Sequence, residues 1–152
     1  MQNIKNVIYS LFFIIILGGC SFNIPQTSKE EMQKIITRVN SSKLIILDVY
    51  HNQCSDCKLI EPVIEKLKSD YTDSSEISFL RYDLSTPFTI FKSKQIAKAL
   101  GLEHIYNLQK YSGVVLIIDT QKKHVLDTLI AEHNLNKYNE VIEERLREKN
   151  AT

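Results

Sequence analysis

The sequence predicts an α/β domain in which helices flank one central mixed β-sheet of about four strands. Two apolar runs, residues 44–50 and 114–119, have the length and the β-branched content of buried strands. Helical and strand patterns alternate as far as the second run, and a hairpin and a closing helix then follow. The length of 152 residues is typical of a single domain.

Caps and apolar spacing predict the elements of the first half. Residues 28–31 (Ser-Lys-Glu-Glu) have the form of a capping box, so the first helix should start there and end near residues 40–42. A second helix should start at the cysteine pair, after the strand 44–50. Its apolar stripe consists of Leu59, Ile60, Val63, Ile64 and Leu67. Residues 77–83 alternate well enough to predict another strand.

The second half is predicted in the same way. Residues 89–100 have the pattern of a helix that Gly101 ends. Residues 102–112 are polar and irregular, and they predict no element. After the strand 114–119, a polar turn leads to residues 125–131, its expected antiparallel partner. The last helix carries an apolar stripe that consists of Leu135, Tyr138, Val141, Ile142 and Leu146.

The N-terminal residues 1–19 have the features of a secretory signal peptide. They begin with a short basic segment, and an apolar run from Val7 to Leu17 leads into small residues before a cleavage point. This run is shorter than the roughly 20 residues that a membrane-spanning helix needs. The segment 17–20 (Leu-Gly-Gly-Cys) resembles the lipobox of bacterial lipoproteins, which implies that Cys20 is lipidated and becomes the mature N-terminus.

This reading divides the chain into three parts. Residues 1–19 are the signal peptide, residues 20–27 carry the lipid and form a tether, and residues 28–152 form the domain. Several acyl chains together hold a protein stably on a membrane. We therefore expect the domain to be anchored in the cell envelope, on the outer face of a bacterial membrane.

Composition narrows the function further. The formal net charge of +1 does not suggest a nucleic-acid partner. Three cysteines are too few for a disulfide scaffold, so each needs its own explanation. We expect a monomer that requires no cofactor.

Cys54 and Cys57 form a C-x-x-C motif directly after the first apolar strand, at the start of the second helix. Backbone N–H groups and the helix dipole stabilise a thiolate at a helix N-terminus. The thiolate is the nucleophile of disulfide exchange. Cys54 is expected to be the exposed attacking residue, and Cys57, one turn further in, is expected to resolve the mixed disulfide.

The segment 48–62 resembles the active-site segment of the thioredoxin family. Five residues match the family pattern, namely Asp48, Cys54, Cys57, Lys58 and Pro62. The order of elements over residues 28–149 also matches, so the resemblance implies a thioredoxin-like fold. It further implies that Asp48 is a buried carboxylate beneath the pair, which helps to take up the proton of Cys57.

The chain departs from that pattern at three places. Gln53 replaces the tryptophan that commonly precedes the first cysteine, and Ser-Asp replaces the usual Gly-Pro between the cysteines. Ser112 and Gly113 occupy the position of the family's cis-proline, and Pro87 lies too early to substitute for it. The missing cis-proline affects the expected substrate recognition more than the expected fold.

The most direct interpretation is a thiol–disulfide oxidoreductase. Its partners would be cysteine-containing client proteins or a membrane electron donor. Asp48 and Asp56 carry negative charges, which disfavour a thiolate at Cys54. We therefore expect the protein to act as a reductant.

Two other functions fit the same residues. The pattern His51-x-x-Cys54-x-x-Cys57 offers three ligands suited to Cu(I) or Zn(II), as in a copper-delivery protein. Alternatively, the domain could be a non-catalytic binding module that keeps a structural disulfide.

Overall fold

The structure is a computed structural model that describes residues 28–151. The predicted signal peptide, Cys20 and the whole of the tether up to residue 27 lie outside the described residues. The elements are α2 (Lys29–Ser41), β1 (Leu44–Tyr50), α3 (Ser55–Asp70), β2 (Ile77–Asp83), α4 (Pro87–Leu100), α5 (Glu103–Leu108), β3 (Val114–Asp119), β4 (Val125–Ile130) and α6 (Leu135–Asn150). No helix within the described range is long and apolar enough to cross a membrane.

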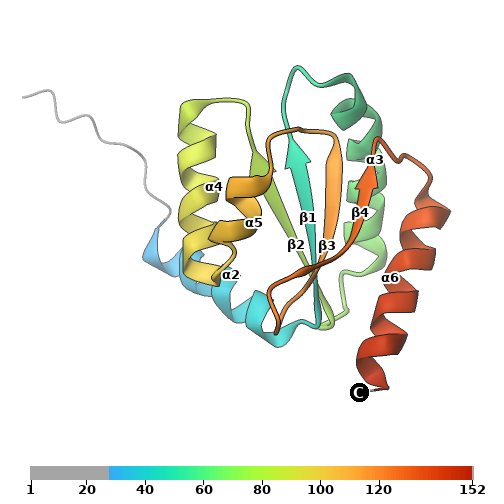
Figure 1. Ribbon diagram of the computed structural model, residues 1–152. Coiled ribbons are helices and arrows are strands. Elements are labelled where there is room, and N and C mark those ends of the chain that lie inside the picture. Colours follow the sequence, from blue (N-terminus) through green and yellow to red (C-terminus); the bar gives the residue numbers. More distant parts are fainter. Residues whose placement is uncertain (1–27, 152) are drawn as a thin grey trace, which may run out of the picture.

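The four strands form one sheet in the order β2-β1-β3-β4 (Figure 1). β1 pairs with β2 in parallel, whereas β1 with β3 and β3 with β4 are antiparallel. The predicted central mixed sheet is therefore confirmed. β1 lies inside the sheet with a neighbour on each side, which explains why its sequence is apolar almost throughout.

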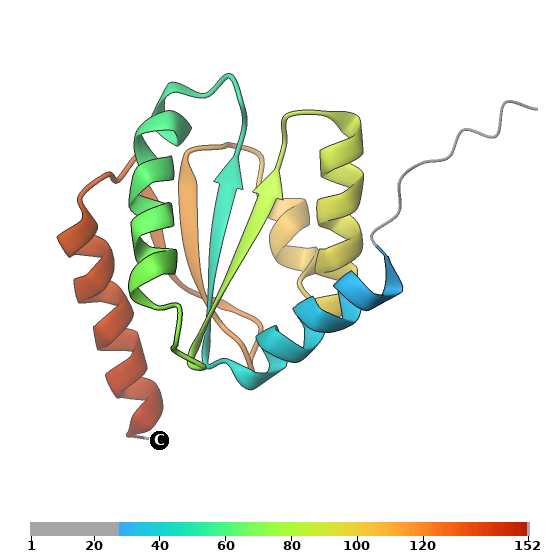
Figure 2. The same cartoon turned by 180° about the vertical axis from the view of Figure 1, so that it is seen from behind.

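Helices cover both faces of the sheet, as the views from the two sides show (Figures 1 and 2). Ile45, Leu47 and Val49 of β1 pack in the cluster that includes residues of α2, α4 and α5. Leu44 and Ile46 pack in the opposite cluster, with residues of α3 and α6. Because side chains alternate along a strand, Asp48 points to the same face as Leu44 and Ile46, toward α3.

Two predictions about the elements need correction. The helix expected at 89–100 begins at Pro87, because Thr86 caps it by accepting a hydrogen bond from the Thr89 N–H at 3.1 Å. Proline is well suited to that first position. The stretch 102–112, expected to be irregular, contains the short helix α5, which buries Ile105 and Tyr106. Six residues are too few to show a helical period in the sequence.

Candidate functional site

Cys54 and Cys57 lie where β1 leads into α3. Both are free thiols, Cys54 half-buried and Cys57 only 2% exposed. Cys54 is the N-cap of α3, and its Sγ accepts a hydrogen bond from the Cys57 backbone N–H at 3.1 Å. The predicted placement of the pair at a helix N-terminus is thus what the structure has, with Cys54 as the more accessible thiol.

The two thiols have opposite pKa shifts. Burial raises the pKa of Cys54, but hydrogen bonds from the Cys57 thiol, the Ser112 hydroxyl and the Cys57 N–H outweigh it, so the pKa ends below its ordinary value. Burial and the hydrogen bond to Cys54 raise the pKa of Cys57. This asymmetry suits a pair in which Cys54 attacks as a thiolate and Cys57 holds a proton until a later step.

The expected electrostatic effect of Asp48 and Asp56 on Cys54 needs correction. Asp56 does raise the pKa of Cys54, yet the net shift is downward. The reason is that hydrogen bonds act directly on the sulfur, and they outweigh the nearby negative charge. The three donors belong to Cys57 and Ser112.

The segment at the position of the family's cis-proline packs directly against the pair. The Gly113 N–H donates to the Val49 carbonyl at 2.9 Å, and Gly113 has a φ of +75°. A β-carbon on Gly113 would lie 3.4 Å from Cys54 Sγ and 3.2 Å from Asp56 Cβ. No peptide bond among residues 28–151 is cis. This position therefore requires glycine both for its backbone conformation and for lack of space.

Ser112 is a site residue to which sequence reasoning assigned no role. Hydrogen bonding by its hydroxyl acts to lower the pKa of both the Cys54 and the Cys57 thiol. The available signal was its position just before the apolar strand 114–119. A lone serine in a polar loop gives no sign of this contact, which depends on the pairing of β3 with β1.

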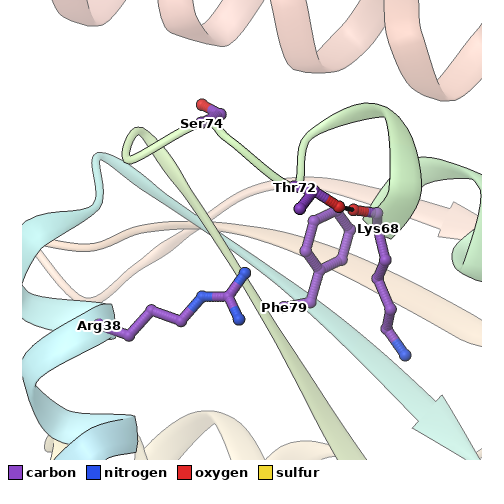
Figure 3. A pocket seen from close by; sticks show the side chains of 5 residues that line it. All are labelled: Arg38, Lys68, Thr72, Ser74 and Phe79. Atoms are coloured by element: carbon purple, nitrogen blue, oxygen red, sulfur yellow. Dashed lines mark hydrogen bonds between the residues drawn. The ribbon is translucent and has the colours of Figure 1, made fainter.

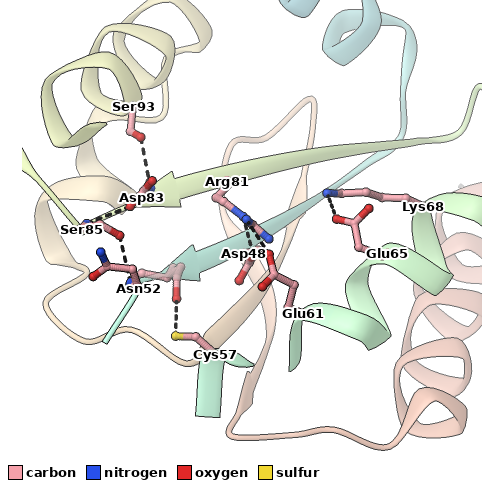
Figure 4. Close-up of polar contacts among 11 residues, drawn as sticks. Asp48, Asn52, Cys57, Glu61, Glu65, Lys68, Arg81, Asp83, Ser85 and Ser93 are labelled. Carbon is pink, nitrogen blue, oxygen red and sulfur yellow. Dashed lines mark hydrogen bonds and ion pairs between the residues drawn. The ribbon is translucent and has the colours of Figure 1, made fainter. Parts of the chain in front are cut away.

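Asp48 is buried as predicted, with 4% of its surface exposed. Its Oδ2 accepts a hydrogen bond from Arg81 Nε at 2.8 Å, and Arg81 Nη1 reaches Glu61 Oε1 at 3.1 Å (Figure 4). Burial raises the pKa of the Asp48 carboxyl, while the Arg81 charge opposes that shift. Sequence reasoning assigned no role to Arg81 and Glu61, because each looks like an ordinary polar surface position.

No hydrogen bond joins Asp48 to either cysteine in the part of the chain that the structure describes. The Cys57 thiol instead donates to the Val49 carbonyl at 3.9 Å. Asp48 directly precedes Val49 in β1, and Asp48 and Cys57 are both buried. The role of Asp48 as a proton acceptor stays a prediction.

His51 lies in the loop before the cysteine pair, and hydrogen bonds within that loop hold it in place. His51 Nδ1 accepts a hydrogen bond from the Gln53 N–H at 3.0 Å, and the His51 carbonyl accepts one from the Cys54 N–H at 3.1 Å. The Asn52 N–H donates to Ser85 Oγ at 2.9 Å, which ties this loop to the one after β2. Within residues 28–151, no group of three or more histidine, cysteine or acidic side chains is placed to hold a metal ion.

A separate pocket lies at the other end of the sheet, where β2 begins (Figure 3). It has a volume of about 370 Å³ and is lined by Arg38, Lys68, Thr72, Ser74 and Phe79. β1 runs parallel to β2 from this end, and the cysteines follow its far end. The pocket is therefore not part of the site formed by the two cysteines.

Comparison with curated proteins gives relatives of two kinds. A peptide-N(4)-(N-acetyl-beta-glucosaminyl)asparagine amidase from Caenorhabditis briggsae is 32% identical over 109 residues, which are 64% of this chain and 17% of that protein. A thioredoxin from Coprinus comatus is 33% identical over 67 residues, 44% of this chain and 61% of the relative. A thioredoxin from Borreliella burgdorferi is 33% identical over 60 residues, which are 40% of this chain and 44% of that protein. The chain thus spans less than two thirds of each of these relatives.

Solved thioredoxin structures are also similar to this chain. The germline-specific thioredoxin Deadhead from Drosophila melanogaster has a TM-score of 0.49 at 17% identity, over 78% of this chain and 95% of that one. Trxlp from Edwardsiella tarda has a TM-score of 0.48 at 13% identity, over 76% and 94%.

The family identity rests on the sequence pattern of the family Thioredoxin, which matches residues 23–103. That stretch is more than half of the chain and contains β1, the cysteine pair, α3 and β2. The predicted thioredoxin-like fold is confirmed by this match together with the observed four-stranded mixed sheet. The chain belongs to the thioredoxin family.

Proposed function

We propose that this protein is a thiol–disulfide oxidoreductase that exchanges disulfides with client proteins through Cys54 and Cys57. One observation carries the proposal. The half-buried Cys54 sulfur caps α3, accepts the Cys57 N–H at 3.1 Å, and has a pKa below its ordinary value, whereas Cys57 is buried and has a raised pKa. A non-catalytic disulfide would need no such difference between its two sulfurs.

Written in the reducing direction, the proposed reaction moves two electrons from the dithiol to the client. The Cys54 thiolate attacks one sulfur of the client disulfide, and that S–S bond breaks as a new one forms between Cys54 and the client. The released client thiolate takes a proton from solvent. Cys57 then loses its proton and attacks Cys54 Sγ, which releases the second client thiolate and leaves a Cys54–Cys57 disulfide.

The proposal extends to location and partners. The lipobox-like segment 17–20 supports a chain lipidated at Cys20 and held on the outer face of a bacterial membrane. Its clients there would be cysteine-containing proteins of the cell envelope, and a membrane electron donor would reduce the pair again.

Insulin reduction tests the reaction. The full chain should accelerate insulin reduction by dithiothreitol, and Cys54→Ser should abolish the acceleration. Cys57→Ser should leave attack possible but prevent resolution, so a mixed disulfide with insulin should accumulate on non-reducing gels. Ser55→Ala, in the same helical turn, is the matched control and should behave as the wild type. A wild type without acceleration, together with a Cys57→Ser variant that traps nothing, would contradict the proposed function.

Labelled fatty acid tests the anchor. The chain expressed in a bacterium should incorporate the label at Cys20. It should also partition into the detergent phase, because the several acyl chains expected on Cys20 give stable anchoring. Cys20→Ala should lose both properties, whereas Cys54→Ala should keep them. An unlabelled wild-type protein recovered in the aqueous phase would show the anchoring proposal to be wrong.

A further inference from the structure

The outer side of helix α4 carries aromatic and basic side chains together. Phe88 and Phe91 are 38% and 44% exposed, although phenylalanine is among the residues most often fully buried. Lys94 and Lys98 are exposed as well. Because these four positions follow each other at intervals of three or four residues, they form one stripe along the side of α4 that faces away from the core.

The charge on α4 has one sign. The helix contains three lysines and no aspartate or glutamate, whereas each of the other helices that the structure describes contains at least one acidic residue. Lys92 is paired with Glu31 of α2 at 3.2 Å. Lys94 and Lys98 have no ion pair with any residue in the range 28–151. The stripe is therefore positively charged at one end and aromatic at the other.

This combination has a physical meaning that neither half has alone. A single exposed apolar side chain is ordinary on a protein surface, and so is a single lysine. Rings and ammonium groups on one side of a helix are typical of helices that lie on a membrane surface. There the rings enter the headgroup region, and the ammonium groups are attracted by anionic lipids.

The described domain begins beside this stripe. α2 starts at Lys29, and its start lies next to α4 in both views of the fold (Figures 1 and 2). The ion pair between Glu31 and Lys92 joins the first turn of α2 to α4. The predicted lipid at Cys20 is eight residues before Ser28, so the chain between them spans at most about 30 Å. A lipidated chain would therefore hold α4 close to the membrane.

We propose that the stripe formed by Phe88, Phe91, Lys94 and Lys98 docks on the anionic headgroup surface of the membrane that holds Cys20. The two rings enter the headgroup region, and the two ammonium groups lie against lipid phosphates. The inference goes beyond disulfide exchange and rests on the lipid anchor of the proposed function.

Docking through α4 would also determine where the cysteine pair lies. α4 follows the end of β2, and the pair follows the end of β1, its parallel neighbour, so both are at the same end of the sheet. The Asn52 N–H donates to Ser85 Oγ at 2.9 Å and so joins the loop before the pair to the loop before α4. A docked domain therefore holds Cys54 near the membrane surface, within reach of a membrane electron donor.

Tryptophan fluorescence tests the docking, because the chain contains no tryptophan of its own. Phe91→Trp is made in the full chain, which is expressed in a bacterium, purified with its lipid and inserted into vesicles of phosphatidylcholine and phosphatidylglycerol. Bromine atoms on the acyl chains of the phosphatidylcholine quench a nearby indole. We expect emission at least about twofold weaker in brominated than in ordinary vesicles, because an interfacial side chain lies about 5–10 Å into the boundary of headgroups and acyl chains.

Ile130→Trp is the matched control. Ile130 is also exposed, but it lies on β4, at the edge of the sheet opposite β2, and α4 packs against β2. The emission of Ile130→Trp should therefore be the same in brominated and in ordinary vesicles. If Phe91→Trp does not fold, Phe88→Trp takes the same test.

The lysines are tested in the chain that carries Phe91→Trp. Lys94→Gln together with Lys98→Gln should lower the ratio of docked to undocked domain by about tenfold, because each lysine near an anionic surface adds to the attraction. High salt, or vesicles of phosphatidylcholine alone, should weaken the quenching in the same way. Lys66→Gln together with Lys122→Gln removes the same charge from α3 and from the turn after β3, and should leave the quenching unchanged.

The anchor and the docking can fail separately. A chain without incorporated fatty acid overturns the anchor and, with it, the docking. A lipidated chain in which the emission of Phe91→Trp is equal in both kinds of vesicle overturns the docking alone, and a face that binds a protein instead of lipid gives that result. Quenching that neither salt nor the substitutions at Lys94 and Lys98 reduce also overturns it. Insulin reduction is measured apart from all these outcomes.

Discussion

Asp48→Asn is expected to lower the turnover of insulin reduction by about a hundredfold near neutral pH, at the lower end of what a general acid or base contributes. Asparagine keeps the shape of the side chain but cannot accept the Cys57 proton. The loss should shrink at high pH, because there the thiolate of Cys57 forms without help. Turnover measured from mildly acidic to alkaline pH gives the comparison. Equal loss at every pH would remove Asp48 from the proton transfer.

The same substitution should change how stability depends on pH. The pKa of Asp48 is raised above 3.8 in the folded protein, so the folded state binds this proton more tightly than the unfolded chain does. Its contribution to the free energy of unfolding is therefore present below the ordinary pKa and is lost as pH rises through the raised pKa. Urea unfolding of wild type and Asp48→Asn should show a difference that falls with pH across this window. A difference independent of pH would contradict the raised pKa.

Gly113→Ala is expected to cost stability and to disturb Cys54, whereas Gly101→Ala should cost stability alone. Both glycines have a positive φ, +75° and +71°. A side chain in that conformation costs about 1–2 kcal/mol. A β-carbon at Gly101 meets nothing within 4 Å, but one at Gly113 would be 3.2 Å from Asp56 Cβ. Asp56 Cβ is bonded to the backbone of α3 and cannot swing away.

The difference between these two variants isolates the contact with the pair. Gly113→Ala should destabilise the fold by about 1 kcal/mol more than Gly101→Ala, the size of a poorly tolerated packing contact. It should also slow alkylation of Cys54 by about two- to tenfold, because displacement weakens a hydrogen bond to the sulfur. Urea unfolding and iodoacetamide rates measure the two effects. Identical behaviour of the two variants would show that residue 113 does not position Cys54.

The fold could be predicted from the sequence because its signals are local and agree with each other. The apolar runs of β1 and β3 and the cap at residue 28 each lie within a few residues. The helix α5 was not predicted, because its burial depends on contacts with distant parts of the chain. These contacts are in the core cluster that includes residues of β1 and β3. The start of α4 was predicted two residues too late. The apolar pattern indicated residue 89, whereas the helix begins at Pro87 because Thr86 caps it.

The site was predictable only along β1 and the start of α3. One continuous segment contains Asp48, Cys54 and Cys57. Their spacing along the strand and the helix is therefore enough to predict their relative positions. Ser112 and Arg81 reach the site from β3 and β2, and their roles depend on strand pairing and register. The carboxylates were expected to raise the pKa of Cys54, and this prediction was wrong for the same reason. One hydrogen-bond donor that lowers this pKa, Ser112, lies on the separate segment before β3.

The sulfur proposed to attack clients is also the sulfur that caps α3. Caps contribute about 0.5–2 kcal/mol to a helix, and a sulfur that has lost its negative charge accepts a hydrogen bond less strongly. In the proposed reaction, formation of the mixed disulfide should therefore loosen the first turn of α3. Cys57 belongs to that turn, and it must approach Cys54 in the next step. The proposed reaction should thus make the first turn of the helix more flexible when Cys57 needs freedom to move, and the turn should become rigid again once the dithiol is restored.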